Sequence, residues 1–307
     1  MPIPTYQELM LPVLQTLREH GPLHTTKCAE MVADMVDLSE QERAEMLPSG
    51  TQRYIVNRTG WAAWYMMQAG LIQRPKRGWI QITDQGRSLL ATNPPKIDRQ
   101  ILMGYPSFVE KMSKGNDQEE GETETESEIG SGGQTPHERI DAAMAELRKS
   151  LVSDLRDQLS SVDPYRFEQI VLDLLLALGY GGSRREAAQV TQKTGDEGID
   201  GVINEDRLGL DVIYVQAKRW AGKVGRPEIQ NFVGALAGKK ANKGIFITTG
   251  DFHSNAREYA GDVQHKIILI DGQRLAELMV DHNIGVSEEQ IYRIKRVDSD
   301  YFDSESV

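Results

Sequence analysis

The sequence has little cysteine and no cluster of histidines. Its 307 residues include one cysteine, Cys28, and six histidines. A single thiol excludes an intramolecular disulfide and a cysteine-rich zinc site, and the histidines show no metal-ligand spacing. Disulfide scaffolds and cysteine-rich zinc domains are therefore excluded, and Cys28 is predicted to be a buried helix residue.

Long apolar runs are absent as well. The longest apolar stretches, such as 170–178 and 267–270, are far shorter than the roughly 20 residues that span a bilayer. The N-terminus also lacks the basic, apolar and small-residue succession of a secretory signal. We therefore expect a cytoplasmic protein with no membrane partner, and its length allows two domains.

The chain as a whole lacks the positive charge that is typical of nucleic-acid-binding proteins. Its net charge is −11, and all of it comes from residues 117–128, with seven acids and no base, and residues 297–307, with four acids. By contrast, residues 51–87 carry six Lys or Arg against one acid, and residues 218–243 carry seven against one. Two basic regions that suit phosphate binding thus persist in an acidic chain.

An acidic stretch rich in Gly, Ser and Thr divides the chain near residues 114–136, because it has too few apolar side chains to fold. We predict a mainly helical domain at residues 1–95, a flexible acidic linker at residues 96–136, and a second domain at residues 137–300. Like charges in the linker repel one another, so the two domains are expected to be loosely coupled.

The first domain is predicted to be helical with one hairpin. Helical spacing of apolar residues predicts helices near residues 9–17, 29–36, 39–47 and 58–69. Gly70 ends the last of these, Leu71–Thr83 is typical of a strand, a basic turn and a second strand, and a final helix starts at residue 83 or 84. This order favours a winged helix, which places a helix in the DNA major groove.

The winged-helix hypothesis assigns DNA contacts to five basic residues. Arg53 and Arg58 flank the helix that would enter the groove, and the hairpin tip carries Arg74, Lys76 and Arg77. The alternative is a protein-interaction module in which the basic tip is only a solvated turn.

The second domain is predicted to be α/β. Two helices, 137–160 and 164–179, come first. Strands are then expected near residues 187–191, 198–203, 212–220, 244–248 and 266–270, with helices at 227–241, 254–264 and 272–282. Meandering strands followed by alternating strands and helices predict a mixed sheet with helices on both faces.

Two strand segments of this domain carry the chemistry for phosphodiester cleavage. Asp200 lies in a short apolar run, and Gln216 and Lys218 alternate along a β-branched strand, so they share one face. If the two segments pair, a carboxylate, an amide oxygen and an ammonium meet at one edge, where the carbonyl of Ala217 could join them. Such a set suits the binding of Mg²⁺ and the activation of a water.

Each of these residues also has a purely structural interpretation. Asp200 could stabilise the turn before Gly201. Gln216 could be a hydrogen-bonded residue on a half-exposed strand, and Lys218 could form a salt bridge with Asp200. An Asp among apolar neighbours is costly unless it is paired, which favours the metal-ligand interpretation.

The motifs at residues 195–201, 215–220, 234–238 and 245–249 closely resemble those of the Mrr restriction endonucleases, members of the PD-(D/E)xK nuclease superfamily. The resemblance runs along nearly the whole chain. It implies a restriction-endonuclease-like mixed sheet flanked by helices, preceded by a winged-helix-like domain. It also implies a modification-dependent, Mg²⁺-requiring endonuclease of a restriction system that cuts methylated double-stranded DNA. Because two strands must be cut, a homodimer or larger assembly is expected.

The resemblance suggests further site residues. Glu168 would reach the metal directly or through water, and Asp196 and Gln230 are weaker candidates. Gln216 stands where the superfamily generally has Asp or Glu, and the Mrr branch is similar to this chain in using Gln. The missing negative charge weakens binding of a second Mg²⁺. Glu197 replaces a Gly that is common in relatives. Candidates for phosphate contacts in this domain are Arg219, Lys223 and Arg226, with Lys239 and Lys240.

Two other functions stay open at this point. The same catalytic fold serves structure-specific junction or repair nucleases, which would prefer branched DNA to methylated DNA. A regulatory DNA-binding protein with an inactive nuclease fold is the other alternative, with Gln216 as a sign of degeneration.

Overall fold

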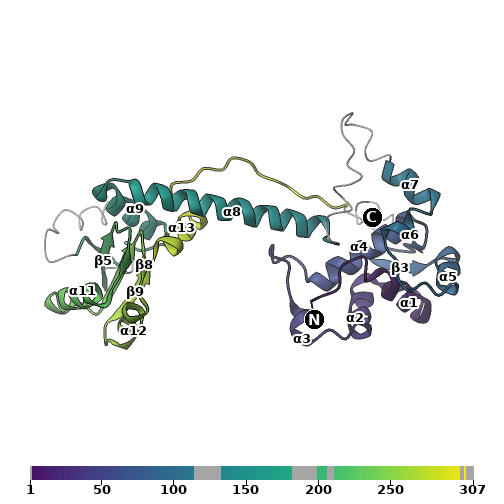
Figure 1. Cartoon of the computed structure of the whole chain (residues 1–307), viewed down its shortest axis with the longest axis horizontal. Coiled ribbons are helices and arrows are strands. Elements are labelled where there is room, and N and C mark those ends of the chain that lie inside the picture. The colour runs from purple at the N-terminus through teal and green to yellow at the C-terminus, as the bar shows by residue number, and fades with distance from the viewer. Residues whose placement is uncertain (1, 114–132, 182–198, 206–210, 298–300, 302–307) are drawn as a thin grey trace. The chain divides into compact units, whose positions relative to one another are not determined.

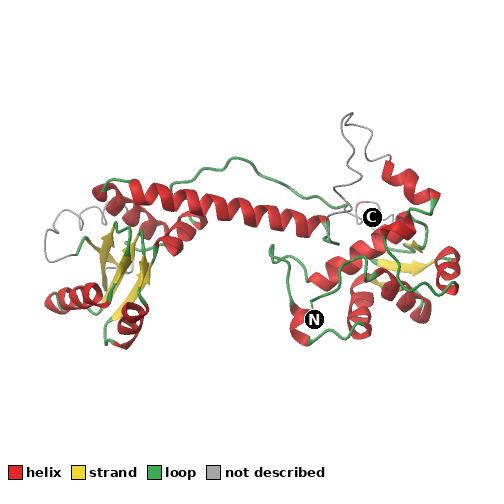
Figure 2. Cartoon of the chain, in the orientation of Figure 1, coloured by secondary structure: helices red, strands yellow, loops and turns green. Residues whose placement is uncertain are grey.

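Two compact units make up the chain. The computed structural model describes residues 2–113, 133–181, 199–205, 211–297 and 301 (Figure 1). The N-terminal unit comprises Met1–Ala145 with Lys295–Val307, and the second unit comprises Glu146–Ile294. Figure 2 shows mainly helices in the first unit and helices around a larger sheet in the second. None of the described helices is long and apolar enough to cross a membrane.

The N-terminal unit is built from helices and three short strands. Its elements before α8 are α1 (Met10–His20), β1 (Leu23–His24), α2 (Thr25–Met35), α3 (Glu40–Ala44), α4 (Tyr54–Gln68), β2 (Ile72–Gln73), β3 (Trp79–Ile82), α5 (Asp84–Ala91), α6 (Arg99–Leu102) and α7 (Pro106–Ser113). Strand β3 pairs antiparallel with both β1 and β2. The predicted hairpin is confirmed, with Ile72 opposite Ile82, whereas β1 was not predicted.

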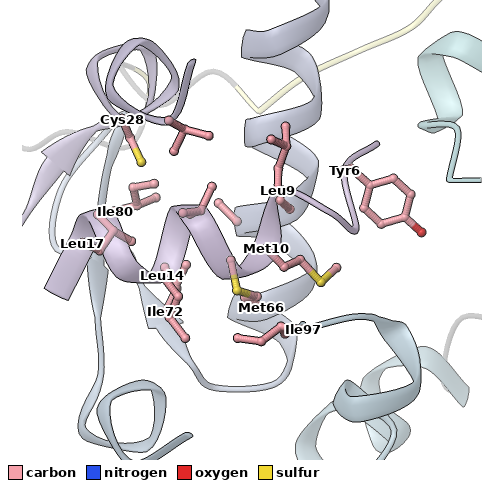
Figure 3. Packing of buried hydrophobic residues seen from close by; sticks show 14 of the residues in the cluster. Tyr6, Leu9, Met10, Leu14, Leu17, Cys28, Met66, Ile72, Ile80 and Ile97 are labelled. Carbon is pink, nitrogen blue, oxygen red and sulfur yellow. The ribbon is translucent and has the colours of Figure 1, made fainter. Parts of the chain in front are cut away.

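The apolar stripe of α1 fills the core of this unit (Figure 3). Met10, Val13, Leu14 and Leu17 recur at helical spacing, and all four are fully buried. Cys28 of α2 belongs to the same core, and burial raises the pKa of its thiol to about 12. The prediction that Cys28 is a buried helix residue is confirmed.

The N-terminal core extends past residue 95, where the linker was expected to begin. Ile97, Leu102 and Phe108 are buried in this core, the last two completely. Residues 96–113 are therefore part of the folded unit. Helices α6 and α7 are too short to show a periodic pattern of their own, and only tertiary packing reveals their role. Of the other expected linker residues, 114–132 lie outside the described part of the chain, whereas residues 133–136 belong to the N-terminal unit, where Thr135 is fully buried.

Helix α8 (Pro136–Ser161) begins in the N-terminal unit and ends in the second. The second unit continues with α9 (Pro164–Ala177), β4 (Gly201–Asn204), β5 (Val212–Lys218), β6 (Lys223–Val224), α11 (Arg226–Gly238), β7 (Lys243–Thr248), β8 (Asp251–Phe252), α12 (Ser254–Asp262), β9 (Lys266–Ile270) and α13 (Gly272–Asp281). The predicted helices and strands of this unit are thus found, within a few residues at their ends. The strand expected near residues 187–191 lies outside the described residues.

A mixed sheet forms the centre of the second unit, as predicted. Its strand order is β4-β5-β7-β9, with β4 antiparallel to β5 and the other pairs parallel. One face packs against α8, α9 and α13 through residues such as Val215 and Ile247. The other face packs against α11 and α12 through Phe246 (Figure 1). The fold class predicted for this domain, an α/β mixed sheet with helices on both faces, is confirmed.

Candidate active site

Strand β4 brings Asp200 beside β5. Gly201 pairs with Val215, and the Asp200 N–H extends the ladder by donating to the Val215 carbonyl at 2.9 Å. The Asp200 carboxylate accepts a hydrogen bond from the Ala217 N–H at 2.8 Å. Residues opposite one another share a face of a sheet, as do alternate residues of one strand. Gln216 and Lys218 therefore share one face of β5, and the Asp200 carboxylate lies beside them at the Ala217 N–H.

Gln216 is a buried polar residue without a partner of its own. It is 6% exposed, and its side-chain amide makes no hydrogen bond with the described part of the chain. The hydrogen bonds expected under the alternative interpretation are thus not found among the described residues.

Lys218 ends β5 on the same face. Its Nζ lies 5.5 Å from the centre of the Trp220 ring, and beside it on β7 stands the fully buried Thr248. Among the described residues, no carboxylate lies within ion-pair distance of Lys218, so the alternative of a salt bridge with Asp200 is not observed. Lys218 is half-buried, and its charge lies close enough to Asp200 to oppose the rise in the pKa of that carboxyl.

Two carboxyl groups of this region are destabilised as anions. Burial raises the pKa of Asp200, against the opposing effects of the Ala217 hydrogen bond and the Lys218 charge. Burial also raises the pKa of Glu168 on α9, and the negative charge of Asp200 raises that pKa further, with a contribution from Asp163. Glu168 and Asp200 are thus close enough to repel each other, as expected if both face one reacting centre.

The oxygen atoms at this edge suit a hard divalent cation. No group of three or more His, Cys, Asp and Glu side chains forms a metal site among the described residues. The candidate donors are instead the Asp200 carboxylate, the Gln216 amide and the Ala217 carbonyl, which are of the kinds that Mg²⁺ accepts. A cation would also relieve the cost of ionising Asp200 and Glu168. The residues present therefore fit Mg²⁺.

The remaining predicted residues of the second unit have varied surroundings. Arg219 donates to the Ser160 carbonyl at 3.0 Å. Lys223 pairs with Asp251 at 3.2 Å. The Arg226 guanidinium lies 4.8 Å from the centre of the Tyr259 ring. All three basic side chains are exposed, and so is Gln230 on α11. Asp196 and Glu197 lie outside the described residues.

The hairpin tip of the N-terminal unit presents basic side chains to solvent. Arg74, Lys76 and Arg77 are exposed between β2 and β3, and the Lys76 Nζ lies 4.1 Å from the centre of the Trp79 ring. Arg53 is half-buried at the N-cap of α4. Three of the five basic residues expected to contact DNA thus form one accessible group.

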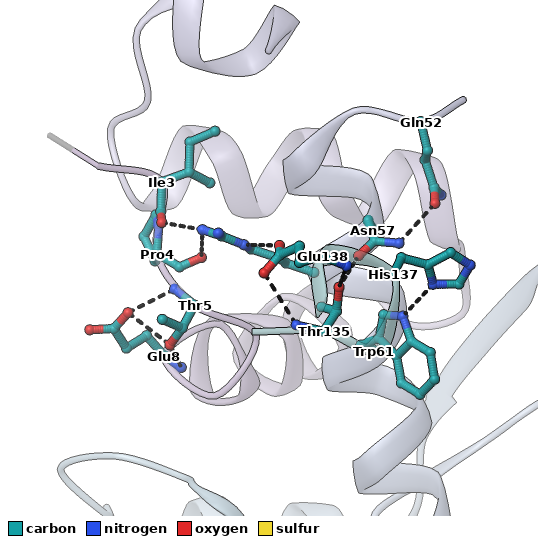
Figure 4. A network of polar contacts seen from close by, with 11 residues as sticks. Ile3, Pro4, Thr5, Glu8, Gln52, Asn57, Trp61, Thr135, His137 and Glu138 are labelled. Atoms are coloured by element: carbon teal, nitrogen blue, oxygen red, sulfur yellow. Dashed lines mark hydrogen bonds and ion pairs between the residues drawn. The ribbon is translucent and has the colours of Figure 1, made fainter. Parts of the chain in front are cut away.

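Arg58 does not belong to an accessible surface, contrary to expectation. Its guanidinium pairs with Glu138 at 2.6 Å, and the two side chains are 16% and 4% exposed. It also donates to the carbonyls of Ile3 and Pro4 (Figure 4). Glu138 belongs to the first turn of α8. Arg58 therefore holds the N-terminal unit together, and we do not include it in a DNA-contacting surface.

Trp220 is a residue of this site that was not predicted. It is 39% exposed beside Lys218. Its backbone is held by Thr249, whose hydroxyl accepts from the Trp220 N–H at 2.9 Å and donates to its carbonyl at 3.0 Å. The signal was its place in the motif at residues 215–220, two positions beyond Lys218.

Two solved structures of restriction enzymes are similar to part of this chain. The DNA modification-dependent restriction endonuclease AspBHI shares 19% identity and a TM-score of 0.34, over 45% of this chain and 36% of its own. The restriction endonuclease MspJI, solved with a 27-mer oligonucleotide, shares 21% identity and a TM-score of 0.28. The match covers 50% of this chain and 34% of MspJI. This chain thus spans about a third of each.

Sequence comparison covers far more of the chain. Residues 6–92 match the Mrr N-terminal domain, and residues 159–279 match the restriction endonuclease domain of Mrr proteins. The type IV methyl-directed restriction enzyme EcoKMrr of Escherichia coli strain K12 is 39% identical over 316 residues, which cover 99% of this chain and 100% of the relative. This chain belongs to the Mrr family of restriction endonucleases.

Proposed function

We propose that this protein is a modification-dependent restriction endonuclease that hydrolyses methylated double-stranded DNA with Mg²⁺. The observation that carries the proposal is the hydrogen bond from the Ala217 N–H to the Asp200 carboxylate, which places that carboxylate beside Gln216 and Lys218 of β5, with Glu168 close enough to be affected by its charge. The name of the relative EcoKMrr, a methyl-directed enzyme, supports methylation as the signal. Since the proposed substrate is DNA, we place the activity in the cytoplasm.

Each residue of the site has a chemical role in this proposal. Asp200, Gln216 and the carbonyl of Ala217 would hold one Mg²⁺, which when bound supplies positive charge at the reacting phosphate. The ammonium of Lys218 orients the attacking water and stabilises the negative charge that grows on the phosphate oxygens. Glu168 contributes a second carboxylate to the same region. One carboxylate and one neutral amide favour a single metal ion over two.

We propose that the N-terminal unit recognises DNA as a winged helix. The succession α1, β1, α2, α4, β2, β3 and the antiparallel order β1-β3-β2 support this proposal. The hairpin tip between β2 and β3 would contact phosphates through Arg74, Lys76 and Arg77. Arg53, at the start of α4, would also contact the DNA. In the second unit, Arg219, Lys223 and Arg226 would contact the backbone of the strand being cut.

Cleavage of defined DNAs tests the proposed function. Full-length protein with Mg²⁺ is expected to cut a plasmid methylated in vitro and to leave the same unmethylated plasmid intact, and chelation of the metal should stop cutting. Gel analysis of plasmids treated with different methyltransferases measures this directly. Preference for unmethylated branched DNA would indicate a junction nuclease instead. Tight binding without any cutting would indicate an inactive regulator.

Asp200→Asn is expected to abolish cutting while raising thermal stability in the absence of metal. Burial raises the pKa of Asp200 in the folded protein, so ionising it costs stability, and the cost is complete once the pH exceeds that raised pKa. Asn keeps an oxygen for the Ala217 N–H but cannot ionise. At pH 8 without metal, the variant should have the higher Tm in a calorimetric scan.

Adding Mg²⁺ provides the control for this prediction. The native Tm should rise with Mg²⁺, because the ion binds the folded state, and the Tm of Asp200→Asn should respond much less. An equal rise in both proteins would contradict the assignment of Asp200 as a metal ligand.

A further inference from the structure

The chain segment that follows Lys218 is tied to the end of β7 by Thr249. The Thr249 hydroxyl accepts from the Trp220 N–H at 2.9 Å and donates to the Trp220 carbonyl at 3.0 Å. The Thr249 N–H donates to the Lys218 carbonyl at 3.3 Å. The hydrogen bonds between the two segments thus continue beyond the last paired position of β5 and β7, where Lys218 lies opposite Thr248.

Two glycines allow the backbone to approach Thr249 and its neighbours closely. A Cβ atom on Gly250 would lie 2.1 Å from the Gly222 carbonyl oxygen and 2.8 Å from the Trp220 carbonyl oxygen. A Cβ atom on Gly272 would lie 2.1 Å from the Thr249 carbonyl oxygen, and the Gly272 N–H donates to the Gly250 carbonyl at 2.8 Å. Only glycine fits at these approaches, so the backbone around Thr249 is held from both sides.

The fixed backbone of Trp220 determines where its ring lies. The ring centre is 5.5 Å from the Lys218 Nζ, within the distance of about 6 Å at which an ammonium is attracted to an aromatic face. Trp220 is 39% exposed and is not a member of either hydrophobic cluster of the second unit. The ring therefore does not serve the packing of the sheet, and its contact with Lys218 needs another explanation.

Lys218 has a long side chain that must act at one point. Lysine carries its charge on a flexible four-carbon stem, whereas a group that stabilises a transition state must be held in place before the reaction. No hydrogen bond or ion pair of the Lys218 ammonium is found among the described residues. The Trp220 ring is the observed contact that restricts where this ammonium lies.

We propose that Thr249 is a positioning residue for DNA cleavage, which fixes Trp220 so that the indole holds the Lys218 ammonium at the end of β5. The hydroxyl of Thr249 places the backbone of Trp220, and the ring places the ammonium. The inference rests on the proposed function, because the ammonium has a reaction to assist only if Lys218 acts on DNA. The arrangement of the three side chains can nevertheless be measured without cleavage.

Thr249→Val tests the role of the hydroxyl. Valine has the shape of threonine but makes neither hydrogen bond to Trp220. Single-turnover cleavage of methylated plasmid should therefore slow about 2- to 30-fold, the range set by the strength of a cation–π contact. Thr249→Ser keeps the hydroxyl and should cut at close to the native rate. The dissociation constant for the same DNA should be native in both variants, because the proposal gives Thr249 no contact with DNA.

A double-mutant cycle shows whether Thr249 acts through Trp220. Trp220→Leu removes the ring and should slow cleavage at least as much as Thr249→Val does. Adding Thr249→Val to Trp220→Leu should then cause no further loss, because the hydroxyl has no ring left to place. Tyr292→Leu is the matched control: it removes an aromatic side chain that is 67% exposed elsewhere in the second unit, and it should leave the rate unchanged.

The surroundings of the Lys218 ammonium can be measured by NMR without DNA. In full-length protein labelled with ¹³C-lysine, the ε-CH₂ signal of Lys218 is identified by its absence from Lys218→Ala. The ring current of the indole should displace this signal from the position of an exposed lysine. The displacement should be lost in Trp220→Leu, reduced in Thr249→Val and retained in Thr249→Ser.

Three results would overturn the role of Thr249. One is an ε-CH₂ signal of Lys218 that is the same in the native protein and in Trp220→Leu. Another is additive losses in the cycle, which would mean that Thr249 does not act through the ring. The third is a Trp220→Leu variant that binds DNA more weakly but cuts at the native single-turnover rate, which would make the indole a DNA contact. A native protein that never cuts DNA would contradict the proposed function instead, and the NMR signal would still decide whether Trp220 holds Lys218.

Discussion

Lys218→Ala is expected to lower the rate of DNA cleavage by roughly 10²–10⁴-fold, the usual contribution of one positioned group that assists proton transfer or stabilises charge. The side chain ends β5 beside Asp200, and no ion pair of Lys218 is found among the described residues. Its loss removes the ammonium next to the reacting phosphate but leaves the oxygen donors of the metal site in place. Single-turnover cleavage of methylated plasmid measures the effect.

Lys266→Ala is the matched control for this variant. Lys266 is an exposed lysine that begins β9. Since β5, β7 and β9 are parallel, it lies at the opposite end of the sheet from Lys218. The control should cut at the native rate, and both variants should bind methylated DNA as the native protein does. Native cutting by Lys218→Ala would exclude Lys218 from the mechanism.

The response of thermal stability to Mg²⁺ separates the roles of Lys218 and Asp200. Lys218→Ala keeps the oxygen donors and removes a positive charge that repels a cation, so Mg²⁺ binding should persist at neutral pH. Asp200→Asn removes the carboxylate ligand itself. The thermal response to Mg²⁺ should therefore survive in the first variant and be lost in the second.

The core of the site was predictable because it depends on local rules. Side chains alternate along any strand, so Gln216 and Lys218 had to share a face once Val212–Lys218 was recognised as a strand. Placing Asp200 with them required only that a neighbouring short strand pair with β5 in the observed register. The burial of Gln216, by contrast, depends on the packing of helices against the sheet and could not be predicted from the strand pattern.

Residues that depend on distant partners were predicted poorly. Arg58 has the sequence features of a DNA-contacting residue, because it lies in a basic region at the start of a helix. Its partner, Glu138, is 80 positions away in the chain, and only the fold brings the two together. The same holds for Leu102 and Phe108, whose short helices show no periodic pattern and are ordered by the core that they complete.

Glu138→Ala is expected to destabilise the N-terminal unit by about 3–5 kcal/mol, because it leaves the buried guanidinium of Arg58 without its counter-charge. Total stabilities of domains are about 5–15 kcal/mol, so this is a large fraction. The substitution also removes a capping box: Glu138 accepts from the Thr135 N–H at 3.2 Å and its own N–H donates to the Thr135 hydroxyl at 3.2 Å. Denaturant unfolding, followed by the fluorescence of Trp61 and Trp64, measures the loss.

A double-mutant cycle shows whether the ion pair is the cause. Arg58→Met alone leaves Glu138 as an unpaired buried charge and should also be strongly destabilising. Combining Arg58→Met with Glu138→Met replaces the whole pair by apolar side chains, and the double variant should be more stable than either single variant. Glu146→Ala, which removes an exposed glutamate from the same helix, should change stability by less than about 0.5 kcal/mol. Additive losses in the cycle would mean that the two residues act independently. Coupled losses would instead show that the first turn of α8 is bound to α4 by this buried pair, and that residues far apart in the sequence fold as one N-terminal unit.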